Sequence, residues 1–157
     1  MKISEILQPG LIMTGLEAKD KWDAIGQLVD LMVEAEKIDP EDRDAIAEAL
    51  FDRERAMSTG MEQGIAIPHA NSHLIDEVVG ALGISDTGVP FESLDGQPAQ
   101  IIILLVIPKD KFQQHVRTLA AIARLFNHVS MTRVLRDAKN PEHVREIIKA
   151  EEGKDLF

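Results

Sequence analysis

The sequence predicts a three-layer α/β/α domain of the α+β class, in which a β-sheet is covered by helices on both faces. Residues 99–108 include seven consecutive aliphatic side chains. This run is about half of the ~20 residues that a membrane-spanning helix needs, and it is typical of a strand buried on both faces. Residues 20–37 and 112–127 repeat apolar side chains at helical spacing. A strand buried on both faces needs cover on both sides, and amphipathic helices provide it.

The first part of the chain is expected to hold a short strand and two helices. The strand lies near 11–14. The helix over 20–37 turns one apolar face toward the core, formed by Trp22, Ile25, Leu28, Val29, Met32 and Val33. Asp39 and Pro40 favour a second helix that runs to about Ala56, because Asp39 can cap free N–H groups and proline suits the first helical position.

Short strands and loops are expected in the middle of the chain. Residues 57–64 carry glycines and hydroxyl side chains, which are typical of a loop. Residues 65–67 form a short apolar strand that Pro68 ends. A further strand is expected over 80–85, and a turn-rich connection over 88–96 leads to the long buried strand.

Three helices are expected after the buried strand. The helix over 112–127 has a core face that consists of Val116, Leu119, Ile122, Ala123 and Phe126. Ser130 can cap a short helix that ends near Asp137. Asn140, with the proline after it, opens a final helix. Residues 151–157 are expected to be a frayed tail.

Length and composition limit the classes of function. The 157 residues fit one domain, residues 1–157, and a net charge of −10 disfavours binding to nucleic acid or to an anionic membrane. The chain has no cysteine, which excludes a disulfide framework, a thiolate metal site and a cysteine nucleophile. The N-terminal region has no apolar stretch of the kind found in a signal peptide. We expect a cytoplasmic protein with no metal or cofactor, and the sequence predicts no particular oligomeric state.

His69 has the most informative surroundings of the five histidines. It follows a strand and a proline, so its backbone is stiff and its ring is presented at an edge. The loop before that strand contains Ser58, Thr59, Gly60 and Gly64, which can offer N–H groups and hydroxyls to a phosphoryl group. Neutral imidazole is a competent nucleophile, and phosphoryl transfer needs little beyond an in-line nucleophile and donors for the phosphoryl oxygens.

Other uses of these residues stay open at this point. His69 and His73 are four residues apart, a spacing that can bind zinc when the segment is helical, although HANSH lacks the glutamate of a zinc protease motif. Ser58 lacks the Gly-x-Ser-x-Gly context of a serine hydrolase. His128 is expected at a helix end, where a cation is favourable, and His143 is expected to be solvated.

The stretch from Arg53 to Ala70, RERAMSTGMEQGIAIPHA, resembles the phosphohistidine signature of the fructose/mannitol-type enzyme IIA domains of the bacterial phosphotransferase system. The family pattern has Arg-Glu, then Ser-Thr-Gly-Ile-Gly-x-Gly-Ile-Ala-Ile-Pro-His. The similarity continues through DGQP at 95–98, the buried strand to Pro108, and His115 in a helix rich in Leu and Ala. It therefore covers nearly the whole chain.

The resemblance implies a mixed sheet flanked by helices and a role for each matching residue. His69 corresponds to the phosphorylated histidine, which accepts a phosphoryl group from the phosphocarrier HPr. His115 corresponds to the second active-site histidine, which helps to stabilise the phosphoryl group by hydrogen bonding. Arg53 corresponds to the active-site arginine, whose guanidinium offsets charge on the phosphoryl oxygens. Ser58 and Thr59 match hydroxyls of the family's loop.

One position departs from the family pattern. Glu62 stands where the family commonly has a second glycine, and Gln63 follows it. The position therefore lacks the positive-φ freedom of glycine. A carboxylate directed at His69 would also oppose an incoming phosphoryl group. We expect the Glu62 side chain to point to solvent.

Three roles are compatible with the resemblance. Nitrogen-related members are stand-alone regulators that bind target proteins according to phosphorylation state, and the opening MKISEIL favours this type. Sugar-transport members pass the phosphoryl group to an enzyme IIB. A binding module of the same fold that has lost phosphotransfer is the third role, and Glu62 is the feature that motivates it.

Overall fold

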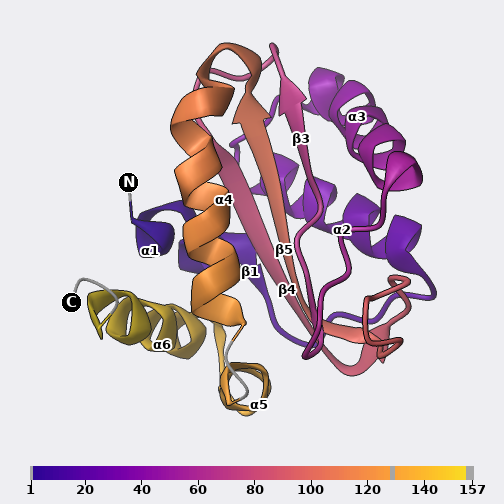
Figure 1. Cartoon of the computed structure of the whole chain (residues 1–157). Helices are drawn as coiled ribbons and strands as arrows, with labels where there is room; N and C mark the ends of the chain where they lie inside the picture. The colour runs from indigo at the N-terminus through magenta and orange to yellow at the C-terminus, as the bar shows by residue number, and fades with distance from the viewer. Residues whose placement is uncertain (1, 128–129, 155–157) are drawn as a thin grey trace.

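The centre of the molecule is a five-stranded mixed sheet (Figure 1). The computed structural model describes residues 2–127 and 130–154. Its two long strands, β4 (Val79–Val89) and β5 (Ala99–Pro108), are antiparallel neighbours. The short β1 (Ile12–Met13) runs parallel to β4, whereas β2 (Ile65–Ala66) and β3 (His69–Ser72) run parallel to β5 one after the other. The mixed sheet that the sequence implied is confirmed.

One face of the sheet is covered by α2 (Lys21–Glu34) and α3 (Arg43–Ala56). Alternate residues of β5 belong to this core, namely Ile102, Leu104 and Val106. Successive side chains of a strand point to opposite faces, so the intervening residues must be covered by other elements.

The opposite face is covered by α4 (Phe112–Phe126), α5 (Met131–Arg136), α6 (Pro141–Lys154) and the short α1 (Ile3–Ile6). The second core includes the other β5 side chains, Ile101, Ile103, Leu105 and Ile107. Both faces of β5 are therefore buried, which confirms the expectation drawn from its apolar run, and each fully buried aliphatic side chain stabilises the fold by about 2 kcal/mol.

The two ends of the chain are joined in a way that corrects the expected frayed tail. α6 continues to Lys154, so residues 151–154 are helical, while 155–157 lie outside the described residues. The Glu152 carboxylate accepts hydrogen bonds from Ile3 N–H, from Ser4 N–H at 3.2 Å and from the Ser4 hydroxyl at 2.6 Å. These bonds hold α1 and α6 together and order the last turn of α6.

Strand β3 is an element that the sequence did not predict. The expected strand ended at Pro68, but pairing with β5 resumes at once, with His69 opposite Leu105. The segment HANS is polar, so its composition does not favour a strand. Its side chains nevertheless alternate, with Ala70 and Ser72 buried, His69 half-buried and Asn71 exposed.

Two expected helix caps are absent. A short 3-10 turn at 40–42 precedes α3, and the Asp39 side chain makes no capping hydrogen bond. The Ser130 side chain makes no capping bond to α5 either. Asn140, by contrast, accepts a hydrogen bond from His143 N–H at 2.8 Å, which is the expected start of α6. The expectation for His128 lies outside the described residues.

Helix α4 is less buried than its pattern predicted. Ile122 and Phe126 are in the core, but Val116 is 43% exposed and Ala123 is only half-buried. The N-terminal half of α4 therefore leaves apolar side chains partly exposed to solvent rather than deep in the core. Among the described residues no helix is long and apolar enough to cross a membrane.

Candidate functional site

His69 is the first residue of β3, and its ring is held in a defined orientation. The Nδ1 atom lies 2.8 Å from the carbonyl oxygen of Ile67. A carbonyl can only accept a hydrogen bond, so Nδ1 carries the hydrogen and Nε2 has the free lone pair. The backbone of this segment is fixed as well, because Leu105 N–H donates to the Pro68 carbonyl at 3.0 Å. The site therefore presents a preoriented Nε2.

The protonation state of His69 also suits a nucleophile. Burial lowers the pKa of the His69 imidazole, and the positive charge of Arg53 lowers it further. The hydrogen bond to Ile67 and the negative charge of Glu54 act in the opposite direction on the same pKa. Because burial is the largest effect, the neutral ring is favoured at neutral pH.

Arg53 lies in the last turn of α3, beside His69. Its Nη1 donates to the carbonyl oxygen of Met57 at 3.1 Å, which turns the guanidinium toward the loop that leaves α3. Arg53 and His69 line the same two hollows. The structure therefore brings these two predicted residues together.

His115 occupies the first turns of α4, and its relation to His69 stays a prediction. It shares a helical face with Phe112 and Leu119, each of which lines one of the hollows at His69. His115 itself lines neither of them. Its Nδ1 lies 3.4 Å from the Thr118 hydroxyl, and its pKa is lowered by burial and by the charge of Lys111.

The hydroxyls of Ser58 and Thr59 are engaged inside the loop. Ser58 donates to the carbonyl oxygen of Phe91. Thr59 donates to Glu54, from its hydroxyl at 2.6 Å and from its N–H at 2.9 Å. In this structure both side chains hold the loop in place, and a contact with a phosphoryl group stays a prediction.

Glu54 is a residue that the sequence analysis did not single out. It is 2% exposed, and besides Thr59 it accepts from the ammonium of Lys21, also buried, at 3.2 Å. Lys21 pairs with Glu92 at 3.1 Å and lies 5.0 Å from the centre of the Trp22 ring. The network joins α2, α3 and the loop after β4. Glu54 was visible only as the neighbour of Arg53 in the signature, and Lys21 had no sequence signal.

The predicted phosphoryl loop is joined to a second loop, residues 90–98. A Cβ added to Gly60 would lie 2.6 Å from the Ser93 hydroxyl oxygen and 2.9 Å from the Phe91 carbonyl oxygen, so only glycine fits there. Gln63 N–H donates to the Asp95 carboxylate at 3.1 Å. The conformation of the loop therefore depends on residues about thirty positions away.

Glu62 does not disturb the site in this structure. Its side chain is exposed, as expected, and it lines neither hollow at His69. The positive φ angles of the loop fall at Gln63 (66°) and Gly64 (77°) instead. Position 62 therefore does not need the conformational freedom of glycine.

Two hollows of different character meet at His69. One, of about 460 Å³, has apolar walls that include Leu119, Met57 and Leu94, the last two being 67% and 80% exposed. The other, of about 470 Å³, runs along β3 and is lined by Asn71, His73, Lys109 and Phe112 together with the shared Arg53 and His69. The histidine ring thus stands between an apolar surface and a polar groove.

His69 and His73 do not have the helical arrangement that a zinc site with their spacing requires. His69 and His73 lie at the start and just past the end of a strand, so their Cα atoms are ~13 Å apart and they do not share one turn of a helix. No group of three or more potential metal ligands is present among residues 2–127 and 130–154.

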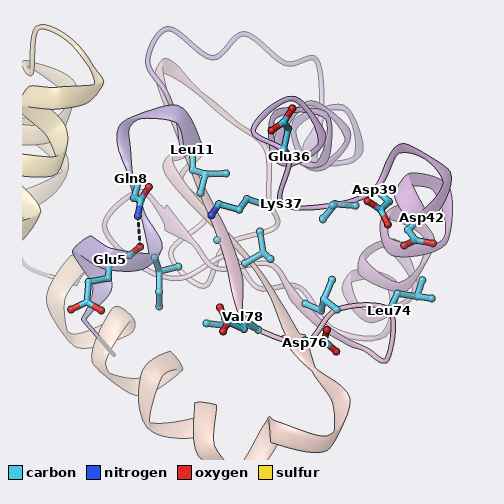
Figure 2. Close-up of a pocket in the computed structure, with 16 residues that line it drawn as sticks. Glu5, Gln8, Leu11, Glu36, Lys37, Asp39, Asp42, Leu74, Asp76 and Val78 are labelled. Carbon is cyan, nitrogen blue, oxygen red and sulfur yellow. Dashed lines mark hydrogen bonds between the residues drawn. The ribbon is translucent and has the colours of Figure 1, made fainter.

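A larger hollow, of about 570 Å³, lies elsewhere and has the opposite charge (Figure 2). Six acidic residues and one lysine, Lys37, line it; the acidic residues are Glu5, Glu36, Asp39, Asp42, Asp76 and Glu77. It shares no lining residue with the hollows at His69. A negatively charged phosphoryl group would be repelled there.

Comparison with known proteins identifies the family. Residues 5–151 match the family model described as "Phosphoenolpyruvate-dependent sugar phosphotransferase system, EIIA 2". The chain is 34% identical over 148 residues to the fructose-specific EIIABC component of Bacillus subtilis. The aligned region covers 94% of this chain but only 23% of that longer protein.

Two further relatives match over nearly their whole length. The fructose-specific EIIA component of Haloferax volcanii is 32% identical over 93% of this chain and 94% of its own. A nitrogen regulatory protein of Bradyrhizobium diazoefficiens is 28% identical over 94% of this chain and 95% of its own.

Solved structures agree with this assignment. Nitrogen regulatory protein IIA-Ntr from Neisseria meningitidis superposes with a TM-score of 0.84 at 29% identity, covering 93% of this chain and 98% of that one. Enzyme IIAMTL in its complex with phosphorylated enzyme IIBMTL from Escherichia coli has the same fold, with a TM-score of 0.76 at 19% identity over 92% and 97% of the two chains. The chain therefore belongs to the EIIA 2 family of the phosphoenolpyruvate-dependent sugar phosphotransferase system.

Proposed function

We propose that this protein is a cytoplasmic phosphocarrier that accepts a phosphoryl group on Nε2 of His69 from an HPr-type donor, and that its phosphorylation state regulates target proteins. The observation that carries the proposal is the hydrogen bond of His69 Nδ1 to the Ile67 carbonyl oxygen, because it leaves Nε2 as the nucleophilic atom.

The transfer step needs only groups that the site contains. The Nε2 lone pair of His69 attacks the phosphorus of the donor, the bond between phosphorus and the donor's leaving atom breaks, and that atom keeps the electron pair. Negative charge is spread over the three phosphoryl oxygens as this happens. The guanidinium of Arg53 has N–H groups besides the one bonded to Met57, and these stabilise that charge.

His115 is the second proposed active-site histidine. Its face of α4 is shared with Phe112 and Leu119, which line the hollows on either side of His69. A hydrogen bond from the His115 ring to a phosphoryl oxygen would stabilise phosphohistidine after the transfer.

The apolar hollow supports docking of a protein donor. Met57 and Leu94 are highly exposed for apolar side chains, and both lie at the edge of the hollow that contains His69. Exposed apolar side chains grouped around a reactive residue are typical of a transient protein interface. The acidic character of the chain favours a basic donor surface.

The regulatory role is favoured over sugar transport by the nitrogen regulatory relatives. The IIA-Ntr structure matches at a TM-score of 0.84, against 0.76 for IIAMTL. The fructose-specific relatives, at 34% and 32% identity, support the alternative in which the phosphoryl group passes on to an enzyme IIB. The exposed Glu62 gives little support to a module that has lost phosphotransfer.

Phosphorylation can be tested directly with phosphoenolpyruvate, enzyme I and HPr. We expect an acid-labile, base-stable phosphoprotein from wild type and from His143→Ala, a control at a solvent-exposed histidine of α6. His69→Ala should not be labelled. Equal labelling of wild type and His69→Ala would exclude the proposal.

A second experiment distinguishes the regulatory role from the sugar-transport role, since both begin with phosphorylation of His69. Phosphorylated protein is mixed with a purified enzyme IIB of the fructose type. A regulator should keep its phosphoryl group over the time in which a transport IIA passes it to IIB, so rapid transfer would favour the sugar-transport alternative.

A further inference from the structure

The polar groove beside His69 extends well beyond the space that a phosphoryl group needs. Its floor is one face of β3, where residues two apart point the same way, so His69, Asn71 and His73 form a row. The Cα atoms at the two ends of this row are ~13 Å apart. Its far end is therefore distinct from the position that phosphohistidine would occupy.

The groove is positively charged on a strongly negative protein. The chain has 27 acidic residues against 17 lysines and arginines, yet none of the described residues that line the groove carries a carboxylate. Arg53 lines the groove from α3, and Lys109 lines it from the 3-10 turn before α4.

The far end has hydrogen-bond donors without partners. Within the described part of the chain, the side chains of Lys109 and His73 make no ion pair or hydrogen bond. Lys111 of the same turn, by contrast, donates to the Asp76 carbonyl oxygen at 2.7 Å. Ala49 and Phe112 add apolar wall between the charged groups. A volume of about 470 Å³ is within the range of small-molecule sites.

We propose that this groove binds a phosphate ester of a small metabolite, with its phosphate between Lys109 and His73 and its carbon portion against Phe112. The ammonium and imidazole N–H groups form charge-assisted hydrogen bonds to the phosphate oxygens, and the Asn71 amide adds a neutral donor. The bound ester covers the approach to His69 from the groove.

The bound ester and phosphohistidine exclude one another, because the ester covers the approach to His69 from the groove and its phosphate adds negative charge on the side from which the phosphoryl group would arrive. This exclusion rests on the proposed phosphorylation of His69, whereas the binding itself does not. A metabolite would in this way control how much of the protein is phosphorylated.

The binding can be measured on the unphosphorylated full chain by NMR. Glycerol 3-phosphate, inorganic phosphate and sodium chloride are titrated separately at matched ionic strength, while the His73 ring C–H and Asn71 side-chain amide signals are followed. We expect saturable shifts with both phosphates, tighter for the ester because Phe112 contacts its carbon atoms, and no saturable shift with chloride.

Matched variants locate the site. Lys109→Gln should weaken ester binding about tenfold, since it removes a charged hydrogen-bond donor. Lys149→Gln removes the same charge from an exposed position of α6 and should bind as wild type. His69→Ala should still bind the ester. Binding by Lys109→Gln at wild-type strength would overturn the proposal, and equal affinity for inorganic phosphate would overturn its metabolite part.

The exclusion is tested by labelling with the HPr system at an ester concentration near the wild-type Kd. Labelling of wild type should slow about twofold, and labelling of Lys109→Gln, which is then only about one-tenth occupied, should slow by about a tenth at most. Unchanged labelling of wild type would refute the exclusion. If wild type is never labelled, the proposed function fails, while the binding measured with His69→Ala stands or falls separately.

Discussion

The groove beside His69 and the acidic hollow of Figure 2 differ in charge although they belong to one small domain. Among the described residues, the groove is lined by Arg53 and Lys109 and by no carboxylate, whereas the acidic hollow is lined by six acidic residues and Lys37. A net charge of −10 describes neither of them. The difference teaches that, among the described residues, carboxylates are absent from the lining of the groove beside His69, where they would repel an arriving phosphoryl group.

Reversing one charge in the groove should have the largest effect. Arg53→Glu makes the His69 site resemble the acidic hollow, and we expect the labelling rate to fall at least about 100-fold, since one preorganised donor to the transition state contributes on that order. Lys37→Glu makes the same charge change in the acidic hollow and should leave labelling nearly unchanged, because a distant exposed charge is screened. Equal loss in the two variants would mean that overall charge, rather than the groove, controls transfer.

The buried charges of Glu54 and Lys21 should contribute mainly to stability. Glu54→Gln leaves the buried ammonium of Lys21 with Glu92 alone, which is 79% exposed, and should destabilise the fold by about 3 kcal/mol. The measurement is urea unfolding followed by the fluorescence of Trp22, the single tryptophan.

A control on the same helix makes this result specific. Glu48→Gln removes an exposed partner of Arg55 and should change the free energy of unfolding by less than about 0.5 kcal/mol. If the two variants are equally stable, the buried pair does not hold the loop as described.

Close packing between the two loops predicts a smaller loss. Gly60→Ala places a methyl group against the Phe91 carbonyl and the Ser93 hydroxyl, and should destabilise the protein by about 1–3 kcal/mol and slow labelling as the loop shifts. Gly10→Ala, which has open space around it, should do neither. A Gly60→Ala protein with full stability and labelling would show that the loops are not in close contact.

The pKa of His69 gives the smallest expected effect. Burial lowers it, so between the native pKa and ~6.5 the unfolded chain binds more protons than the native one. The stability associated with a neutral His69 is complete above pH ~6.5 and is lost as the pH falls through the native pKa. An NMR titration of the ring C–H signals measures that pKa.

Two substitutions should move this pKa in opposite directions. Arg53→Gln removes a positive neighbour and should raise it, while Glu54→Gln removes a negative one and should lower it. A native His69 that titrates at or above ~6.5 would contradict the account of its burial.

The sequence predicted the layers of the fold because the pattern of apolar residues decides them. The aliphatic run of β5 and the amphipathic patterns of α2 and α4 are local signals, and the structure confirms the layers. Strand β3 and the cap made by Glu152 were not predicted, because they depend on pairing and on contacts between distant parts of the chain.

The candidate site likewise contains residues that a local sequence pattern predicted and residues that only the three-dimensional structure brings there. Arg53 and His69 were predicted from a contiguous signature, and the structure brings them together. Lys21 is 33 residues from its partner Glu54, and no local pattern relates them. Lys109 enters the groove only because the turn after β5 passes beside β3.

The nitrogen of His69 that carries the phosphoryl group tests the central claim most directly. NMR of protein labelled with ¹⁵N in histidine, phosphorylated by the HPr system, resolves the phosphorus–nitrogen coupling at each ring position. Because Nδ1 is bonded to the Ile67 carbonyl, we predict coupling at Nε2 of His69 and no phosphohistidine signal in His69→Ala. Phosphorylation at Nδ1, or a phosphohistidine signal that survives in His69→Ala, would contradict the account.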